Sequence, residues 1–356
     1  MHRQFFRLAI AAVAVATPVA YAHDVGIGPQ PLGDGKVSSE PKVGYLWSCR
    51  TNFGGGVGAH RLGPWARDGV WHPKEKITVR GAVNWPNASI SLVVEGAQRV
   101  VRANGLPKHA TGVFPIGRDD PAYQFDRNPN AIAAQTALLR LPAVPVAAAK
   151  PSCVPMGMIG FALTGVAIFN AVDAAGRDAP AYEIQDACSG HPERGGTYHY
   201  HDYSACMTDE AGKAGRHSDL VGYALDGYGI FGPKGEGGKR LHNADLDACH
   251  GHTHEVAWDG EKRTIYHYHF TDEYPYSIGC FAGTPVNQPQ GGPGGPPPGG
   301  GPDQVLAVAA RELGVDVARL RAAIGPPPPD FARAARELGL REARIRTAMQ
   351  RARAGR

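Results

Sequence analysis

The sequence of 356 residues lacks the signatures of several large protein classes. It contains no uninterrupted apolar run of about 18 residues, so no segment is predicted to span a membrane. It has no Gly-x-Ser-x-Gly nucleophile elbow, no phosphate-binding loop and no dinucleotide-binding fingerprint, which argues against the common serine hydrolases and nucleotide-binding enzymes. It also has no Cys-x-x-Cys pair, which argues against a thiolate zinc site and a thioredoxin-like redox centre.

The first 22 residues have the pattern of an export signal. Arg3 and Arg7 give a positive start, a short apolar run covers residues 8–19, and Ala20-Tyr-Ala22 fits the small-x-small rule for cleavage. The chain has six cysteines, and an even number in an oxidising compartment predicts three disulfides. We therefore expect a periplasmic or secreted protein without a transmembrane segment.

Composition divides the rest of the chain into four segments. Residues 23–44 are rich in glycine, proline and small polar residues and predict an extended lead-in. Residues 45–286 contain short apolar runs broken by glycine, proline, asparagine and aspartate, which predict a mainly β domain, sandwich-like or barrel-like, with long loops. We expect one helix there, over residues 130–141. The expected strands cover residues 77–83, 90–94, 160–163 and 166–169.

The last two segments differ from the β-rich part. Residues 287–302 are a Pro/Gly linker, and residues 303–356 are predicted to form a small helical repeat, in which Ala-Ala-Arg-Glu-Leu-Gly occurs at 309–314 and again at 334–339. The repeat contains 11 arginines and 6 acidic residues, so the net charge of +4 for the whole chain arises there. In an exported protein this tail predicts contact with an acidic protein or surface, and no nucleic-acid binding.

An internal duplication is the central feature of the sequence. Asp186-Ala-Cys-Ser-Gly-His191 is followed, six residues later, by Tyr198-His-Tyr-His201. Asp247-Ala-Cys-His-Gly-His252 is followed, thirteen residues later, by Tyr266-His-Tyr-His269. Two matched constellations in one chain predict a duplicated supersecondary unit.

Alternating tyrosine and histidine predicts that both tetrapeptides are β-strands. The two histidines of each strand then share one face, about 6.6 Å apart along the strand, and the tyrosines share the other. Imidazoles at this spacing reach one ion at about 2 Å each, and the preceding Gly-His motif offers a third imidazole. The expected metal ligands are His191, His199, His201, His252, His267 and His269. The ligands of the two copies form two sites or one shared site. Such a donor set suits a transition-metal ion, zinc or copper above all, unless the histidines only bond the main chain.

Other residues of the duplicated unit are candidates for supporting roles. Asp186 and Asp247 either accept a hydrogen bond from a ligand histidine or shape a turn. His250 and His254 have no counterparts in the first copy and either enrich the second site or lie at the surface. The cysteines bracket the histidine strands, so symmetry favours three bridges: Cys188–Cys206, Cys249–Cys280 and, by remainder, Cys49–Cys153.

The chain resembles the YHYH domain proteins over roughly residues 80–286. The resemblance is carried by the stretches 103–115, 186–192, 222–233 and 274–283, together with the Tyr-His-Tyr-His tetrapeptide. It implies an exported bacterial protein and implies no particular reaction. It also draws attention to His109, in the Asn-Gly-Leu-Pro-Lys-His stretch, as a further site residue or a loop residue.

Three functions follow from these patterns. The first is an exported metal-binding protein for sequestration, delivery or sensing. The second is a metal-dependent enzyme, a hydrolase or an oxidoreductase, with Asp219, Asp226 or Glu255 as the base, although no spacing selects one of them. The third is a structural or interaction protein in which the histidines bind no metal. Metal content separates the third function from the other two, and metal-dependent turnover separates the second from the first.

Overall fold

A computed structural model of the chain describes residues 28–53, 59, 61–207, 215–286, 302–325 and 329–353. The expected export signal at 1–22 and all but the last residue of the expected linker lie outside this part. The segment boundaries therefore stay predictions. Within the described residues, no helix has the length and apolar character needed to cross a membrane.

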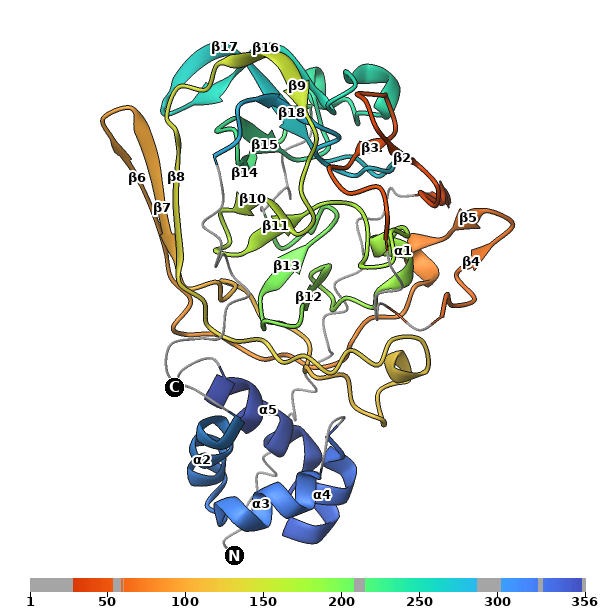
Figure 1. Cartoon of the computed structure of the whole chain (residues 1–356), viewed down its shortest axis with the longest axis vertical. Coiled ribbons are helices and arrows are strands. Elements are labelled where there is room, and N and C mark those ends of the chain that lie inside the picture. The colour runs from red at the N-terminus through yellow and green to blue at the C-terminus, as the bar shows by residue number, and fades with distance from the viewer. Residues whose placement is uncertain are drawn as a thin grey trace, which may run out of the picture.

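A mixed eight-stranded sheet lies at the centre of the molecule (Figure 1), in the order β12-β13-β11-β10-β14-β15-β17-β16. The first half of this sheet contains β10 (Met158–Ala162), β11 (Ala167–Phe169), β12 (Gly190–Pro192) and β13 (Tyr198–Tyr200). The second half contains β14 (Leu220–Ala224), β15 (Gly229–Phe231), β16 (Gly251–Trp258) and β17 (Glu261–His269). The order is palindromic: β10 and β14 pair antiparallel at the centre, and β11–β13 and β15–β17 are the parallel pairs. The duplicated unit is therefore two four-stranded halves related by an approximate twofold axis.

The likeness between the halves is strongest in their first hairpins. Gly160-Phe-Ala-Leu-Thr-Gly165 in one half corresponds to Gly222-Tyr-Ala-Leu-Asp-Gly227 in the other. The last glycine of each stretch turns the chain, with φ of +98° at Gly165 and +90° at Gly227. Side chains with a Cβ adopt this conformation only with strain, which explains the glycine at both turns.

Smaller sheets surround the central one, and the predicted mainly β class is confirmed. They are formed by β1 (Gln30–Pro31), β5 (Val70–Trp71) and β4 (Ala66–Arg67); β6 (Ile90–Glu95), β7 (Gln98–Ala103) and β8 (Ala137–Pro142); β2 (Val37–Ser38) and β3 (Leu46–Trp47); and β9 (Ala147–Ser152) and β18 (Phe281–Gly283). One short α-helix, α1 (Ala179–Tyr182), precedes β12. The sheets of the described residues do not close into a barrel. They share one apolar core that includes Trp65, Phe114, Ile159 and Phe281.

Two expected elements of this part differ from the structure. The predicted helix at 130–141 is wrong, because its second half is strand β8. Residues Ala137, Leu139 and Leu141 are buried while Leu138 and Arg140 are exposed, and this period of two is that of a strand with one face on the core. The expected strand at 77–83 is reduced to isolated bridges at its third and seventh residues.

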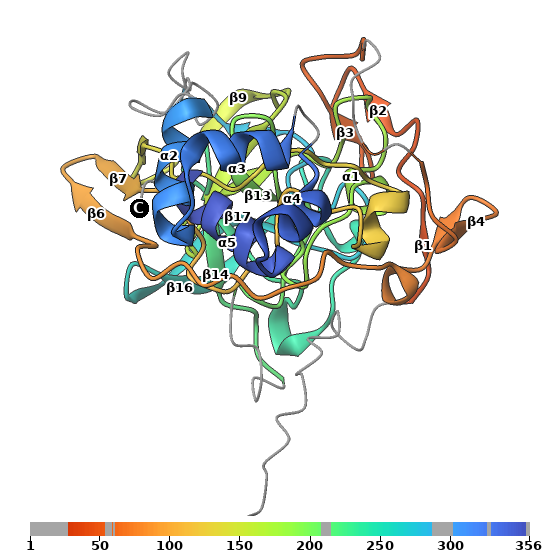
Figure 2. The ribbon, with the colours of Figure 1, turned by 90° about the horizontal axis from the view of Figure 1, so that it is seen from below.

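The tail folds into four helices with an apolar core of their own, below the β-rich part in Figure 1 and in front of it in Figure 2. They are α2 (Pro302–Leu313), α3 (Val317–Ile324), α4 (Phe331–Leu338) and α5 (Glu342–Arg353). The carboxylates of Asp316 and Asp330 cap α3 and α4 by accepting backbone N–H groups.

Helix α5 docks the tail against the β-rich part. The buried guanidinium of Arg346 donates to the carbonyl of Pro115 at 3.0 Å and to the carboxylate of Asp119 at 3.0 Å. The buried amide of Gln350 donates to the carbonyl of Gly112 at 3.4 Å. Arg346, the most buried arginine among the described side chains of the tail, therefore makes an intramolecular contact.

All three expected disulfides are present. They join Cys49 to Cys153, Cys188 to Cys206 and Cys249 to Cys280. The second and third occupy equivalent places in the two halves of the central sheet. No free cysteine remains. Three disulfides are consistent with an extracellular or periplasmic protein.

Candidate metal centres

The first cluster contains the three expected histidines of the first copy and one carboxylate. His191 lies on β12, His199 on β13 and His201 directly after β13, and their ring centroids are 4.5 to 5.4 Å apart. The Nε2 atoms of His199 and His201 are 3.0 Å apart. Oε2 of Glu183, just after α1, is 3.4 Å from Nε2 of His191 and 3.2 Å from Nε2 of His201. The three imidazoles therefore converge, with a carboxylate beside two of them, and we call these four residues cluster one.

Main-chain carbonyls orient the imidazoles of cluster one. Nδ1 of His199 is 3.0 Å from the carbonyl of Thr197, and Nδ1 of His201 contacts the carbonyl of Asn170. A carbonyl only accepts, so each Nδ1 carries the hydrogen and each Nε2 of the neutral ring presents a lone pair. Among the described residues, neither ring nitrogen of His191 has a hydrogen-bond partner, whereas Oε2 of Glu183 lies 3.2 Å from Nε2 of His201. A buried polar group without a partner is costly, and a bound ion would satisfy these atoms.

The second cluster contains five histidines. His252 and His254 lie on β16, His267 and His269 lie on β17, and His217 precedes β14. Their candidate ligand nitrogens all lie within 4.8 Å of one another, and the Nε2 atoms of His252 and His269 are 3.1 Å apart. We call these residues cluster two. The structure thus brings histidines together within each copy and places the two copies in separate clusters.

Main-chain carbonyls orient imidazoles in cluster two as they do in cluster one. Nδ1 of His267 is 2.9 Å from the carbonyl of Ile265, and Nδ1 of His269 is 2.7 Å from the carbonyl of Gly232. Ile265 and Gly232 occupy the places of Thr197 and Asn170 in the first half. The Nε2 atoms of His254 and His267 are buried and have no hydrogen-bond partner among the described residues. Each copy therefore directs Nε2 atoms of its histidines at a point within its own cluster.

The tyrosines of both strands point to the opposite face, as expected. The Tyr198 hydroxyl donates to Asp186 at 2.9 Å, and the Tyr266 hydroxyl donates to Asp247 at 3.1 Å. Each aspartate also accepts the amide of the cysteine two residues later, at 2.8 and 2.9 Å. The carboxylates of Asp186 and Asp247 thus accept hydrogen bonds from turn amides and tyrosines on this face.

Two other candidate histidines lie outside both clusters. His109 is on the tyrosine face, where its Nε2 is 2.5 Å from the hydroxyl of Tyr200. His250 is buried, and its Nε2 is 3.0 Å from Oγ1 of Thr271. Both side chains therefore make structural hydrogen bonds in this fold.

Comparison with known proteins agrees with this architecture. The family described as YHYH protein matches residues 138–241. This part of the chain is a YHYH domain. The match covers the first half of the central sheet, with its tetrapeptide, and the start of the second half, and ends before the second tetrapeptide at 266–269. No curated protein and no solved structure matches the chain.

Burial keeps most imidazoles of the two clusters neutral. It lowers the pKa of His191, His199 and His269 well below the ordinary range, and neighbouring imidazoles lower each further. Burial and the same repulsion lower the pKa of His252 to about 4 and that of His267 to about 3. Neutral imidazole is the form that binds metal, so both clusters hold ligands in the reactive state at neutral pH.

His201 is the exception in the two clusters. Burial lowers the pKa of its imidazole, but the hydrogen bond and charge of Glu183 outweigh this, so the net pKa is raised. A proton on His201 and a metal ion compete for the same Nε2 atom, beside the same carboxylate. The carboxylate of Glu183 therefore stabilises a positive charge in cluster one, carried either by a protonated His201 or by a metal ion.

Two residues of these clusters escaped the sequence analysis for different reasons. Glu183 aligns with Ala244 of the second copy, so a search for repeated residues passes over it. His217 aligns with Pro155 and lies well before the second Gly-His motif. The one sequence feature that could have indicated Glu183 is the position of its carboxylate eight residues before His191. No neighbouring residue marks His217 as a candidate ligand.

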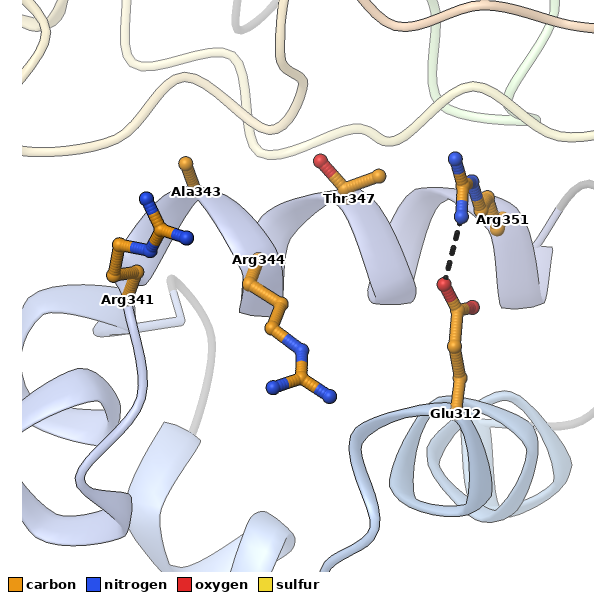
Figure 3. A pocket seen from close by; sticks show the side chains of 6 residues that line it. All are labelled: Glu312, Arg341, Ala343, Arg344, Thr347 and Arg351. Atoms are coloured by element: carbon orange, nitrogen blue, oxygen red, sulfur yellow. Dashed lines mark hydrogen bonds and ion pairs between the residues drawn. The ribbon is translucent and has the colours of Figure 1, made fainter.

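A separate pocket lies in the helical tail (Figure 3). It has a volume of about 460 Å³ and is lined by Glu312, Arg341, Ala343, Arg344, Thr347 and Arg351. Arg351 pairs with Glu312 at 3.0 Å, while Arg341 and Arg344 are exposed. The pocket is therefore positively charged overall.

Proposed function

We propose that this YHYH-domain protein is an exported protein that binds two transition-metal ions, one in each histidine cluster. The observation that carries the proposal is the pairing of bare Nε2 atoms, 3.0 Å apart in cluster one and 3.1 Å apart in cluster two. Both Nδ1 atoms of the His199–His201 pair donate to carbonyls, so in the absence of a proton on His201 the two neutral imidazoles would direct lone pairs at each other. A cation between them turns this repulsion into ligation.

The donor atoms support a transition metal over calcium or magnesium. Both hard cations prefer oxygen ligands, whereas eight of the nine candidate ligand groups in the two clusters are imidazoles. Zinc and copper fit such sites best, and copper binds more tightly by the general order of affinities. Sequestration, delivery or sensing of such an ion outside the cytoplasm is the biological role that we propose.

Elemental analysis of the protein purified without added metal tests this proposal. Two double variants remove the inward histidines of one strand each: His199→Ala with His201→Ala, and His267→Ala with His269→Ala. We expect about two metal equivalents in the wild type and about one in each variant. His242→Ala is the matched control, because this half-exposed imidazole belongs to neither cluster.

Circular dichroism must show that the variants keep the fold. The proposal would be contradicted if the wild-type protein contained no metal and took up neither zinc nor copper in dialysis. In that case the interpretation of the histidines as purely structural would stand.

A metal-dependent enzyme is the second candidate, favoured by one feature of cluster two. His217, His252 and His254 are half-buried, so the imidazoles on this side of the cluster are partly accessible to solvent, as an open coordination position requires. Of the expected bases, Asp226 binds Tyr268 on the tyrosine face, and Glu255 pairs with Lys262 at the surface. Metal-dependent turnover of ester, phosphate or redox substrates, lost in the His267/His269 double variant, would establish this function.

We also propose that the tail contacts an acidic partner through the arginines of its pocket. Arg341, directly before α5, and Arg344, on α5, are both exposed, whereas Arg346 is buried in the docking contact. Binding of polyglutamate that weakens with salt, and that is lost on Arg341→Ala with Arg344→Ala, would support this. Unchanged binding in that double variant would contradict it.

A further inference from the structure

The two clusters have the same inner frame but differ in how exposed their imidazoles are. In cluster one, His191, His199 and His201 are 3%, 2% and 3% exposed, and the side chain of Glu183 is 15% exposed. In cluster two the strand histidines His267 and His269 are fully buried. The remaining three, His217, His252 and His254, are half-buried. The three imidazoles of cluster one are therefore almost fully buried, whereas three of the five imidazoles of cluster two are partly exposed.

The clusters also differ in the number and kind of ligands. Cluster one has three imidazoles and one carboxylate, which is the number that a tetrahedral ion needs. Cluster two has five imidazoles, one more than that number. Because cluster two has one imidazole more than a tetrahedral ion needs, one imidazole can dissociate while four still bind the ion. A chelator can therefore replace the protein ligands one at a time. Cluster one has no spare ligand.

Charge increases this difference. Departure of a dication from cluster one leaves the carboxylate of Glu183 without its partner in a largely buried site, which costs free energy unless a proton replaces the ion. Cluster two holds no carboxylate among its five candidate ligands, so departure of its ion leaves no unpaired negative charge. The residues that make the difference, Glu183, His217 and His254, lie where the duplicated sequences diverge.

We infer that cluster one keeps its ion as a structural site and that cluster two exchanges its ion with the surroundings. This inference rests on the proposed function, because it assigns roles to the two metal sites. Duplication supplied two equal frames, and the divergent residues turned one into a buried site and the other into an exchangeable one. An exported protein with this arrangement delivers or senses metal through cluster two while cluster one stabilises the fold.

Release of zinc to a chromogenic chelator tests the inference. The full-length protein is loaded with two equivalents of zinc, which is measured first by equilibrium dialysis, and is then mixed with an excess of the chelator. We expect two phases of equal amplitude whose rates differ by at least about tenfold. The fast phase should be missing in the His267/His269 double variant, and the slow phase should be missing in the His199/His201 double variant.

Glu183→Gln provides a second reading that does not delete an imidazole. It removes the negative charge while keeping the size of the side chain, so the slow phase should become faster and the fast phase should not change. His242→Ala should leave both phases as in the wild type. Release in a single phase, or a fast phase that belongs to cluster one, would overturn the inference. Absence of zinc from the dialysed protein would instead contradict the proposed function, so the two failures are distinct.

Discussion

Proton release on zinc binding examines the electrostatics of cluster one directly. The His267→Ala/His269→Ala variant removes the two buried ligands of cluster two and leaves cluster one as the strong site. At about pH 6, three imidazoles with the ordinary pKa of 6.5 would each be about three-quarters protonated and would release about two protons per zinc. The structure predicts a smaller number, because burial lowers the pKa of His191 and His199 well below that value.

Only His201 should carry a proton at that pH, because Glu183 raises the pKa of its imidazole. We therefore expect release of about one proton for each zinc bound. Calorimetric titrations in two weakly coordinating buffers of different ionisation enthalpy give this number as the slope of the observed enthalpy. In the same background, Glu183→Gln removes the group that raises the pKa of His201, so the slope should fall towards zero.

A slope near two would mean that the imidazoles titrate as exposed histidines, and the burial argument would be refuted. A slope near zero before Glu183 is replaced would mean that this carboxylate does not hold a proton on His201. Both results are distinguishable from absence of binding, because the titration reports the stoichiometry independently.

Three further predictions concern the rest of the fold. His250→Asn suits the positive φ of +72° and removes an imidazole whose pKa burial lowers to about 3 from 6.5. Below pH 6.5 the unfolded chain binds a proton at this imidazole and the folded chain does not. Between neutral pH and about pH 4.5, the free energy of urea unfolding of the zinc-free wild type should therefore fall by roughly 3 kcal/mol more than that of the variant. Equal falls would contradict this. Arg346→Ala removes the buried contacts to Pro115 and Asp119, so hydrogen exchange at residues 112–119 should increase, whereas Arg344→Ala on the same helix should have no effect. Tyr268→Phe leaves Asp226 and the amide of Ala282 each without one partner, and should lower the free energy of urea unfolding by about 1–3 kcal/mol with little change in zinc stoichiometry; loss of zinc would show that the tyrosine face also supports the metal frame.

Much of the architecture could be predicted because it is written in local patterns. The alternation in Tyr-His-Tyr-His fixes a strand with histidines on one face, and the repeated glycines mark equivalent turns. The bracketing cysteines indicated the correct bridges, since each pair closes one copy of the unit. The helix expected at 130–141 failed because Ala-rich sequence favours a helix locally, while pairing with β7 imposes the period of a strand.

The candidate site could be predicted only in part. His191, His199 and His201 were placed together correctly, because a short antiparallel pairing of β12 with β13 joins them. Glu183 and His217 reach their clusters through the path of the chain around the sheet, which no spacing in the sequence records. The same holds for His250 and His254, two neighbouring histidines of one segment, of which only the second points into cluster two.

By itself the sequence determined the repeated unit, the strand faces and the residue types that favour a metal, because these depend on periods of two and on chemistry carried by single residues. Only the tertiary structure decided that each copy builds its own cluster and that one cluster has a carboxylate and the other two extra imidazoles. It also decided that the imidazoles of one cluster are buried while three of the other are partly exposed. Those properties depend on contacts between residues far apart in the chain, and on which of them keep water out.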